Sequence, residues 1–192
     1  MSITNQFYET HAKDYFDSTV KVDTSRLYER FLKYVPVGCR ILDFGCGSGR
    51  DSKAFVDMGY QVSAIDGAEN LCKLAREYAG IDVKCVDFLS FGSDQKYDAV
   101  WACASLLHIP SSQLPTVINI LKNALVDNGL MYISFKSGNF EGERDGRYYT
   151  DMTSDRFSNL LVKGLRIVEE WYSEDVIKGR TNTWYNVILR KE

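Results

Sequence analysis

Residues 41–52 read ILDFGCGSGRDS, an apolar run that ends in an acid and then breaks into glycines at every second position. A strand followed by a glycine-rich turn and a helix places ligands at the carboxyl end of a sheet. Gly49 falls one place early for the dinucleotide pattern G-x-G-x-x-G, and Arg50 occupies the position that this pattern reserves for glycine. Asp43 lies beside the loop, where a carboxylate would repel a pyrophosphate. The stretch therefore predicts a site for a positively charged cofactor without phosphates.

Beyond this stretch, β-rich runs alternate with segments of helical periodicity. The strand-like runs are residues 40–44, 61–66, 82–87, 97–103 and 130–135, and the helix-like segments are residues 50–58, 68–78 and 113–125. Near-continuous apolar runs joined by helices are typical of parallel strands buried on both faces. Two later runs, 165–173 and 183–190, are joined by only about ten residues, so they should pair antiparallel. The pattern predicts a doubly wound, mostly parallel α/β sheet.

Two helices are expected ahead of the first strand. Phe7, His11 and Tyr15 recur at helical spacing, which predicts one amphipathic helix. A second helix should follow Asp23 and end before Pro36.

Local signals also mark helix ends in the core. Gly59 follows residues 50–58 at the position of a left-handed helix terminus, and Ser111 is expected to cap the helix over 113–125. A further helix is predicted over residues 154–163.

Length and composition narrow the class of protein. The 192 residues suit one domain, with a helical cap over residues 1–36 and a Rossmann-like core over residues 37–192. Lys plus Arg number 23 and Asp plus Glu number 26, for a net charge of −3, which argues against a nucleic-acid partner. No apolar stretch approaches the ~20 residues of a membrane span, and no signal peptide is evident, so we expect a cytoplasmic protein. The five cysteines form no C-x-x-C pair, so we expect reduced thiols and no metal site.

Acidic residues end three successive strand-like runs. Asp43 ends the first, Asp66 with Gly67 ends the second, and Asp87 with Phe88 ends the third. A carboxylate at such a strand end can accept hydrogen bonds from ribose hydroxyls or from an adenine amino group. Each acid is also an ordinary turn residue, but together with the glycine loop they favour a nucleoside cofactor.

Four motifs together resemble the cofactor motifs of class I S-adenosylmethionine-dependent methyltransferases. They are ILDFGCGSGRDS, VSAIDGA at 62–68, CVDFLSF at 85–91 and YDAVWACASLLHIP at 97–110. The segments GRYYTDMTSDRF (146–157) and TWYNVILRK (183–191) also resemble small bacterial members grouped with tellurite-resistance methyltransferases. The resemblance implies a seven-stranded sheet of order 3-2-1-4-5-7-6 with strand 7 antiparallel, and S-adenosyl-L-methionine as the cofactor.

The same resemblance implies roles for individual residues. Asp43, Gly45, Cys46 and Gly47 would line the methionine end, Asp66 and Gly67 the ribose, Asp87 and Phe88 the adenine, and Ala104 the sulfonium region. Cys46 is expected to pack rather than to act as a nucleophile. From the residues themselves, Arg50 is a candidate to hold the cofactor's carboxylate.

Methyl transfer from a sulfonium is an in-line displacement that needs a base only if the acceptor must lose a proton. His108 and Tyr148 are the candidate catalytic residues, in a wider group with Ser105, Lys136, Arg147 and Tyr149. His108 is either a base near neutral pH or the cap of the following turn.

Two segments have alternative readings. The polar stretch 138–151 either covers the acceptor or forms a solvated surface hairpin. The N-terminal aromatic residues either pack in the core or fold over the cofactor, with Tyr15 or Thr19 reaching the methionine carboxylate.

The main hypothesis is thus a methyltransferase acting on a small molecule, as a monomer or homodimer without nucleic acid or membrane. A tellurite-type metalloid methyltransferase and a non-catalytic S-adenosylmethionine-binding or regulatory protein are alternatives, because fold does not fix function. An NAD-linked oxidoreductase is a third.

Overall fold

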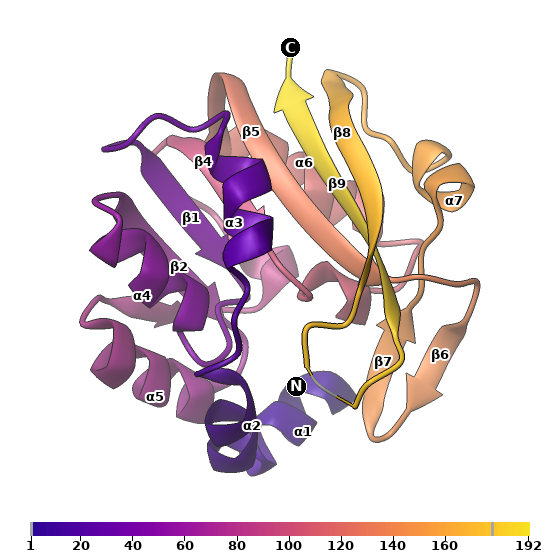
Figure 1. Cartoon of the computed structure of the whole chain (residues 1–192). Coiled ribbons are helices and arrows are strands. Elements are labelled where there is room, and N and C mark those ends of the chain that lie inside the picture. Colours follow the sequence, from indigo (N-terminus) through magenta and orange to yellow (C-terminus); the bar gives the residue numbers. More distant parts are fainter. Residues whose placement is uncertain (1, 178) are drawn as a thin grey trace.

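A seven-stranded sheet forms the centre of the structure, a computed structural model that describes residues 2–177 and 179–192 (Figure 1). Its strands are β1 Arg40–Phe44, β2 Gln61–Asp66, β3 Val83–Cys85, β4 Tyr97–Ala102, β5 Leu125–Lys136, β8 Leu165–Glu174 and β9 Thr183–Lys191. They follow the order β3-β2-β1-β4-β5-β9-β8, with β1 to β5 parallel and β9 antiparallel to both β5 and β8. The predicted doubly wound sheet and its strand order are confirmed.

The central strand β1 is buried on both faces, as its mostly apolar sequence predicts. Ile41, Leu42 and Phe44 have no exposed surface. Because successive side chains of a strand point to opposite faces, Ile41 and Leu42 enter different core clusters. Burying a large apolar side chain stabilises a fold by about 1.5–3 kcal/mol, so β1 anchors the layers on both of its sides.

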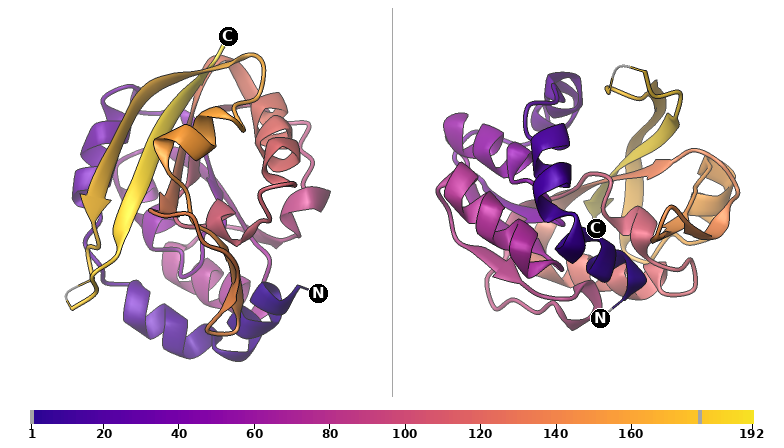
Figure 2. Two further views of the ribbon diagram at one scale, coloured as in Figure 1. Left: turned by 90° about the vertical axis from the view of Figure 1, so that its right-hand side faces the viewer. Right: turned by 90° about the horizontal axis from the view of Figure 1, so that it is seen from below.

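Helices cover both faces of the sheet (Figure 2). They are α3 Ser25–Leu32, α4 Arg50–Asp57 and α5 Glu69–Ala79 on one face, and α6 Leu114–Ala124 and α7 Ser154–Ser158 on the other. Phe31 of α3 and Phe55 of α4 pack in the cluster of Ile41. Val117 of α6 packs in the cluster of Leu42. Helical connections between parallel strands produce these layers.

The N-terminal segment forms two helices, α1 Ile3–Thr10 and α2 Ala12–Thr19. The prediction of one continuous amphipathic helix is therefore wrong. His11 interrupts it with φ −108° and ψ 22°, and its backbone N–H and its Nδ1 both lie 2.9 Å from the carbonyl oxygen of Phe7. The imidazole thus shares the carbonyl that an uninterrupted turn would use alone. Both helices lie below the sheet in the view of Figure 1, where α1 contacts α5 and β7.

The stretch between β5 and α7 contains a second, two-stranded sheet of β6 Glu141–Arg144 and β7 Arg147–Thr150. Asp145 and Gly146 connect them with φ of 51° and 74°, as a two-residue hairpin turn requires. The hairpin also contacts the N-terminal helices, because the backbone N–H of Tyr148 donates to Oγ1 of Thr4 at 3.0 Å.

Two predicted helix ends need correction. Ser111 does not cap α6, because the helix begins after Gln113 and has no side-chain cap; the backbone N–H of Ser111 donates to Oε1 of Glu141 at 2.8 Å. Helix α7 ends at Ser158 rather than near residue 163, because the following apolar residues 160–162 turn onto the core. Gly59 follows α4 with φ 89°, as predicted. Among the described residues, no helix has both the length and the apolar character needed to cross a bilayer.

Candidate cofactor and acceptor site

The glycine loop after β1 is packed so closely that one of its positions has no room for a side chain and another has little. At Gly45, with φ 85°, a Cβ atom would lie 2.5 Å from Cβ of Ser105. At Gly47, with φ 55°, a Cβ atom would lie 3.1 Å from the ring of Tyr15. Both φ values lie in the left-handed region that favours glycine. The loop therefore presents bare backbone between the ends of β1 and β4 and helix α2.

Asp66 at the end of β2 holds this loop in place. Its Oδ2 accepts a hydrogen bond from the backbone N–H of Gly47 at 2.9 Å, and its Oδ1 accepts one from the N–H of Ala68 at 3.0 Å. Burial raises the pKa of Asp66, and these backbone donors partly oppose the rise. Each carboxylate oxygen has a second lone pair, so Asp66 can also accept hydrogen bonds from a ligand.

A cavity of about 340 Å³ lies where β1, β2 and β4 end, and we call it the smaller cavity. Its lining includes Gly45, Gly47, Asp66, Gly67, Leu71, Asp87, Phe88 and Ser105. The ring of Phe88 packs on Phe44 with centroids 4.4 Å apart, and Asp87 accepts a hydrogen bond from the N–H of Leu89. Oγ of Ser105 is buried without a partner among the described residues. An aromatic wall beside polar acceptors suits a nucleoside.

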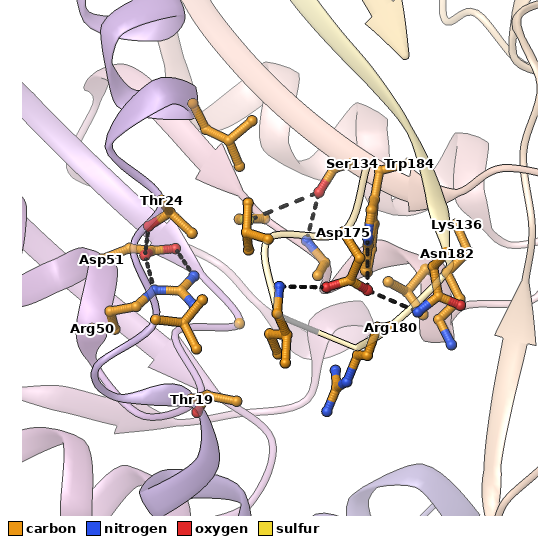
Figure 3. A pocket seen from close by; sticks show the side chains of 18 of the residues that line it. Thr19, Thr24, Arg50, Asp51, Ser134, Lys136, Asp175, Arg180, Asn182 and Trp184 are labelled. Carbon is orange, nitrogen blue, oxygen red and sulfur yellow. Dashed lines mark hydrogen bonds and ion pairs between the residues drawn. The ribbon is translucent and has the colours of Figure 1, made fainter. Parts of the chain in front are cut away.

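A larger cavity of about 440 Å³ extends from the glycine loop past β5 to the hairpin and the segment before β9 (Figure 3). Five residues line both cavities: Tyr8, Tyr15, Gly45, Ala104 and His108. Ala104 has a φ of 52°, which is strained for a residue with a side chain, and its N–H donates to Oγ of Ser134 at 2.8 Å. The two cavities thus meet beside the end of β4.

Arg50 and Asp51 form a buried ion pair on the wall of the larger cavity (Figure 3). Nε and Nη2 of Arg50 donate to the two carboxylate oxygens of Asp51 at 2.6 and 3.0 Å. Tyr28 and Trp101 also donate to Asp51, at 2.6 and 2.8 Å. These donors and the charge of Arg50 hold the pKa of Asp51 below its usual range against its burial. The remaining N–H groups of Arg50 have no hydrogen-bond partner within the described part of the chain, so they can hold an anionic group of a ligand.

Of the residues predicted at the methionine end, Asp43 lies deeper than expected, whereas Cys46 lines the larger cavity. Asp43 is 2% exposed, lines neither cavity and accepts a hydrogen bond from Oγ of Ser52 at 2.6 Å. Burial and the nearby Asp51 raise the pKa of Asp43. Cys46 is buried beside the larger cavity, and burial raises the pKa of its thiol well above its usual range. A protonated thiol is a poor nucleophile, which agrees with a packing role.

His108 is held by two hydrogen bonds where the cavities meet. Its Nδ1 lies 2.7 Å from the carbonyl oxygen of Tyr148, and its Nε2 lies 2.9 Å from the hydroxyl of Tyr8. A carbonyl oxygen only accepts, so Nδ1 carries the proton and Nε2 accepts from Tyr8. Burial lowers the pKa of His108 to about 4 and raises that of Tyr8 to about 12. His108 is thus a neutral imidazole whose lone pair is already engaged.

Tyr148, the second predicted catalytic residue, uses its hydroxyl elsewhere. That hydroxyl donates to Oε1 of Glu141 at 3.1 Å on the exposed side of the hairpin. The backbone of Tyr148 contributes more to the site, because its carbonyl fixes the tautomer of His108.

Comparison with known proteins agrees with this geometry. Residues 41–129 match the sequence model of a family described as "Methyltransferase domain". Residues 41–129 thus carry a methyltransferase domain of this family.

One similar relative of this methyltransferase domain is the ubiquinone biosynthesis O-methyltransferase of Xanthomonas axonopodis pv. citri. It is 35% identical over 107 residues, which are 52% of this chain and 44% of the relative. The chain thus spans less than half the length of that relative.

Two solved structures share the fold of the methyltransferase domain. The N-methyltransferase NodS from Bradyrhizobium japonicum WM9, in complex with S-adenosyl-L-homocysteine, is 14% identical with a TM-score of 0.72 and covers 95% of this chain and 97% of its own. TehB from Haemophilus influenzae is 19% identical with a TM-score of 0.73 and covers 94% and 67%, respectively. At these identities the likeness supports the fold alone.

The residues of the methyltransferase domain fit S-adenosyl-L-methionine. In the smaller cavity, Asp66 has lone pairs for the ribose hydroxyls and Ser105 has an unpaired hydroxyl oxygen. Beyond the point where the cavities meet, Arg50 has unused donors for the methionine carboxylate. The elongated pair of cavities thus offers polar groups in the order in which this cofactor would need them.

Most predicted cofactor residues of the methyltransferase domain do come together. Gly45, Gly47, Asp66, Gly67, Asp87, Phe88, Ala104 and Tyr15 line the smaller cavity, and Cys46 and Arg50 line the larger one. Sequence reasoning missed Tyr8 and Asp51. An acid on the buried side of α4 was a signal for Asp51, whereas nothing local marks Tyr8 as a partner of His108.

Proposed function

We propose that the chain is a methyltransferase that transfers the methyl group of S-adenosyl-L-methionine to a small-molecule acceptor in the larger cavity. One observation carries this proposal: the nucleoside-like smaller cavity adjoins a second, polar cavity, and Tyr8, Gly45, Ala104 and His108 line both. An in-line displacement needs the acceptor and the sulfonium to face each other across such a junction.

The chain's own residues would bind and orient the reactants. Asp66 would hold the ribose, Asp87 and Phe88 the adenine, and Arg50 the methionine carboxylate. When bound, the cofactor supplies an electrophilic methyl group, so the protein needs no nucleophile of its own. Asp43 would act at one remove, by holding the start of α4 through Ser52.

The N-terminal helices α1 and α2 would form a cap over the cofactor. Tyr8 of α1 and Tyr15 of α2 line both cavities, so these helices cover the region where the cavities meet. Their rings would exclude water from the sulfonium, which supports transfer to the acceptor rather than hydrolysis.

The predicted role of His108 as a general base stays untested, and the geometry favours a different role. Its lone pair accepts the Tyr8 hydroxyl hydrogen, and burial lowers its pKa to about 4. We therefore expect His108 to position Tyr8. If the acceptor must lose a proton, we expect that proton to leave to solvent.

The test is an assay for the demethylated cofactor. The purified chain is incubated with S-adenosyl-L-methionine and small carboxylic acids, phenols, amines and thiols, and S-adenosyl-L-homocysteine is measured by mass spectrometry. We expect acceptor-dependent release that falls at least about tenfold in Asp66→Asn, while exposed Asp94→Asn leaves it unchanged. Binding of the cofactor without release from any acceptor would instead support a non-catalytic binding protein.

A further inference from the structure

Three cationic side chains converge on the ring of Tyr149 in the wall of the larger cavity. Nζ of Lys136 lies 4.5 Å from the ring centroid, and the guanidinium carbons of Arg144 and Arg147 lie 4.4 and 5.3 Å from it. They come from three different strands, β5, β6 and β7. The ring attracts each cation, but like charges gathered beside it repel one another, so a bound anion would stabilise the cluster.

The protein itself compensates only one of these cations with a carboxylate. Arg144 donates to both oxygens of Asp151, at 3.0 and 2.7 Å. Within residues 2–177 and 179–192, neither Lys136 nor Arg147 forms an ion pair. Burial and the charges of both arginines lower the pKa of Lys136. Two cations of the cluster thus have no ion-pair partner among the described residues, and the charge of Asp151 only partly opposes the lowering of the Lys136 pKa.

Arg147 is the more constrained of the two. Its planar group lies 4.4 Å from the ring centroid of Phe7, and its only hydrogen bond among the described residues is a long one from Nη1 to the Tyr8 hydroxyl at 3.4 Å. Its Nε is buried without a partner there. An unpaired buried donor on a guanidinium costs free energy that a bound anion can recover.

The carboxylates of the larger cavity do not neutralise these two cations. Asp51 is paired with Arg50. Asp175 accepts hydrogen bonds from Asn182, Trp184 and the backbone of Ile177 (Figure 3).

The other two cavity-lining carboxylates, Asp145 and Glu174, belong to exposed residues and form no ion pair among the described residues. Arg180, also exposed, adds a further positive charge to this cavity. The inner wall next to Tyr149 therefore keeps a positive charge.

We propose that the methyl acceptor is a small anion, bearing a carboxylate or another oxyanion, whose charged group is held between Lys136 and Arg147. This inference rests on the proposed function, because it gives the part of the larger cavity next to Tyr149 to the acceptor. Lys136 offers a mobile point charge at the end of β5, and Arg147 offers a rigid planar donor at the start of β7, a pairing that suits oxyanions. The Tyr8 hydroxyl lies beside Arg147 and links the anion site to His108 and the junction of the cavities.

The test measures anion binding to the full chain saturated with S-adenosyl-L-homocysteine, so that the cofactor site is filled. Benzoate, benzamide and sulfate are titrated separately by calorimetry. We expect benzoate or sulfate to bind at least about tenfold more tightly than neutral benzamide. Raising the salt concentration from about 0.05 M to about 0.5 M should weaken binding of the anions and leave the affinity for benzamide unchanged.

Two variants assign the site. Lys136→Met and Arg147→Met should each weaken anion binding at least about tenfold. Exposed Lys73→Met and Arg26→Met remove the same charges elsewhere and should not change it. Titration of S-adenosyl-L-homocysteine into each variant checks that it is folded.

The possible outcomes are distinguishable. If no anion binds more tightly than benzamide, or if both cavity variants bind it as the wild type does, the acceptor proposal is overturned while the proposed function stands. If S-adenosyl-L-homocysteine itself does not bind to the wild type, the proposed function is overturned first.

Discussion

The hydroxyl of Tyr8 lies 2.9 Å from Nε2 of His108, joining helix α1 to the segment after β4. The contact lies where the two cavities meet, and Tyr8 also receives a hydrogen bond from Arg147. It therefore connects the region proposed for the cofactor to the region proposed for the acceptor.

Tyr8→Phe keeps the ring and removes the hydroxyl. Because Nε2 of His108 then loses its donor in a buried site, we expect the free energy of unfolding to fall by about 1–2 kcal/mol. Urea unfolding of Tyr8→Phe, His108→Phe and the double variant measures the coupling. Additive losses in this cycle would show that the two side chains do not interact.

His108 should make stability depend on pH. Its pKa is lowered to about 4 in the folded chain, so between about pH 4 and pH 6.5 the unfolded chain binds a proton that the folded chain does not. Stability should therefore fall as the pH is lowered through this window. From about pH 7 to about pH 5 the wild type should lose about 1–2 kcal/mol more than His108→Gln.

The comparison uses urea unfolding at both pH values, and all other titrating groups cancel because both proteins contain them. Equal losses in the wild type and in His108→Gln would mean that the imidazole is not buried in its neutral form.

Breaking the Arg50–Asp51 ion pair at the start of helix α4 should strongly lower the free energy of unfolding. Asp51→Ala leaves the guanidinium and the donors of Tyr28 and Trp101 without their acceptor, so we expect a loss of about 3–5 kcal/mol. Asp57, the exposed ion-pair partner of Lys53 on the same helix, is the control: Asp57→Ala should change the free energy of unfolding by at most about 0.5 kcal/mol. If denaturant unfolding showed similar losses of stability in Asp51→Ala and Asp57→Ala, Asp51 would not be the centre of a buried network.

Gly45→Ala should disrupt the site by direct contact. The added methyl group would lie 2.5 Å from Cβ of Ser105, so both stability and binding of S-adenosyl-L-homocysteine should fall. Gly80 also has a positive φ, of 70°, but no atom lies within 4 Å of its added Cβ, so Gly80→Ala should cost only about 1 kcal/mol of strain. Thermal unfolding measures the stability of both variants, and calorimetry measures their affinity for S-adenosyl-L-homocysteine. Equal losses in Gly45→Ala and Gly80→Ala would show that close packing around Gly45 adds nothing to the backbone strain.

The sequence predicts the sheet well because its signals are local. The apolar run of β1, the glycine loop and the alternation of strands and helices can each be read within a short window, and strand order followed from the resemblance. The acids Asp66 and Asp87 could be placed because parallel strands end at the same edge.

The parts that the sequence did not predict depend on contacts between distant segments. The turn at His11 arises from its own imidazole bonding to Phe7, against an unbroken helical pattern. The role of Ser111 was missed because its N–H meets Glu141 from the hairpin, and the tautomer of His108 depends on Tyr148 and Tyr8. Periodicity carries no information about such pairings.

The most direct test of the central claim is calorimetric titration of the full chain with S-adenosyl-L-homocysteine and, separately, with NAD. If the two cavities form a methyltransferase site, S-adenosyl-L-homocysteine should bind one-to-one and stabilise the chain against heat, and its affinity should fall at least about tenfold in Asp66→Asn. NAD should neither bind nor stabilise the chain. Absence of S-adenosyl-L-homocysteine binding, equal binding of NAD, or unchanged affinity in Asp66→Asn would contradict the account.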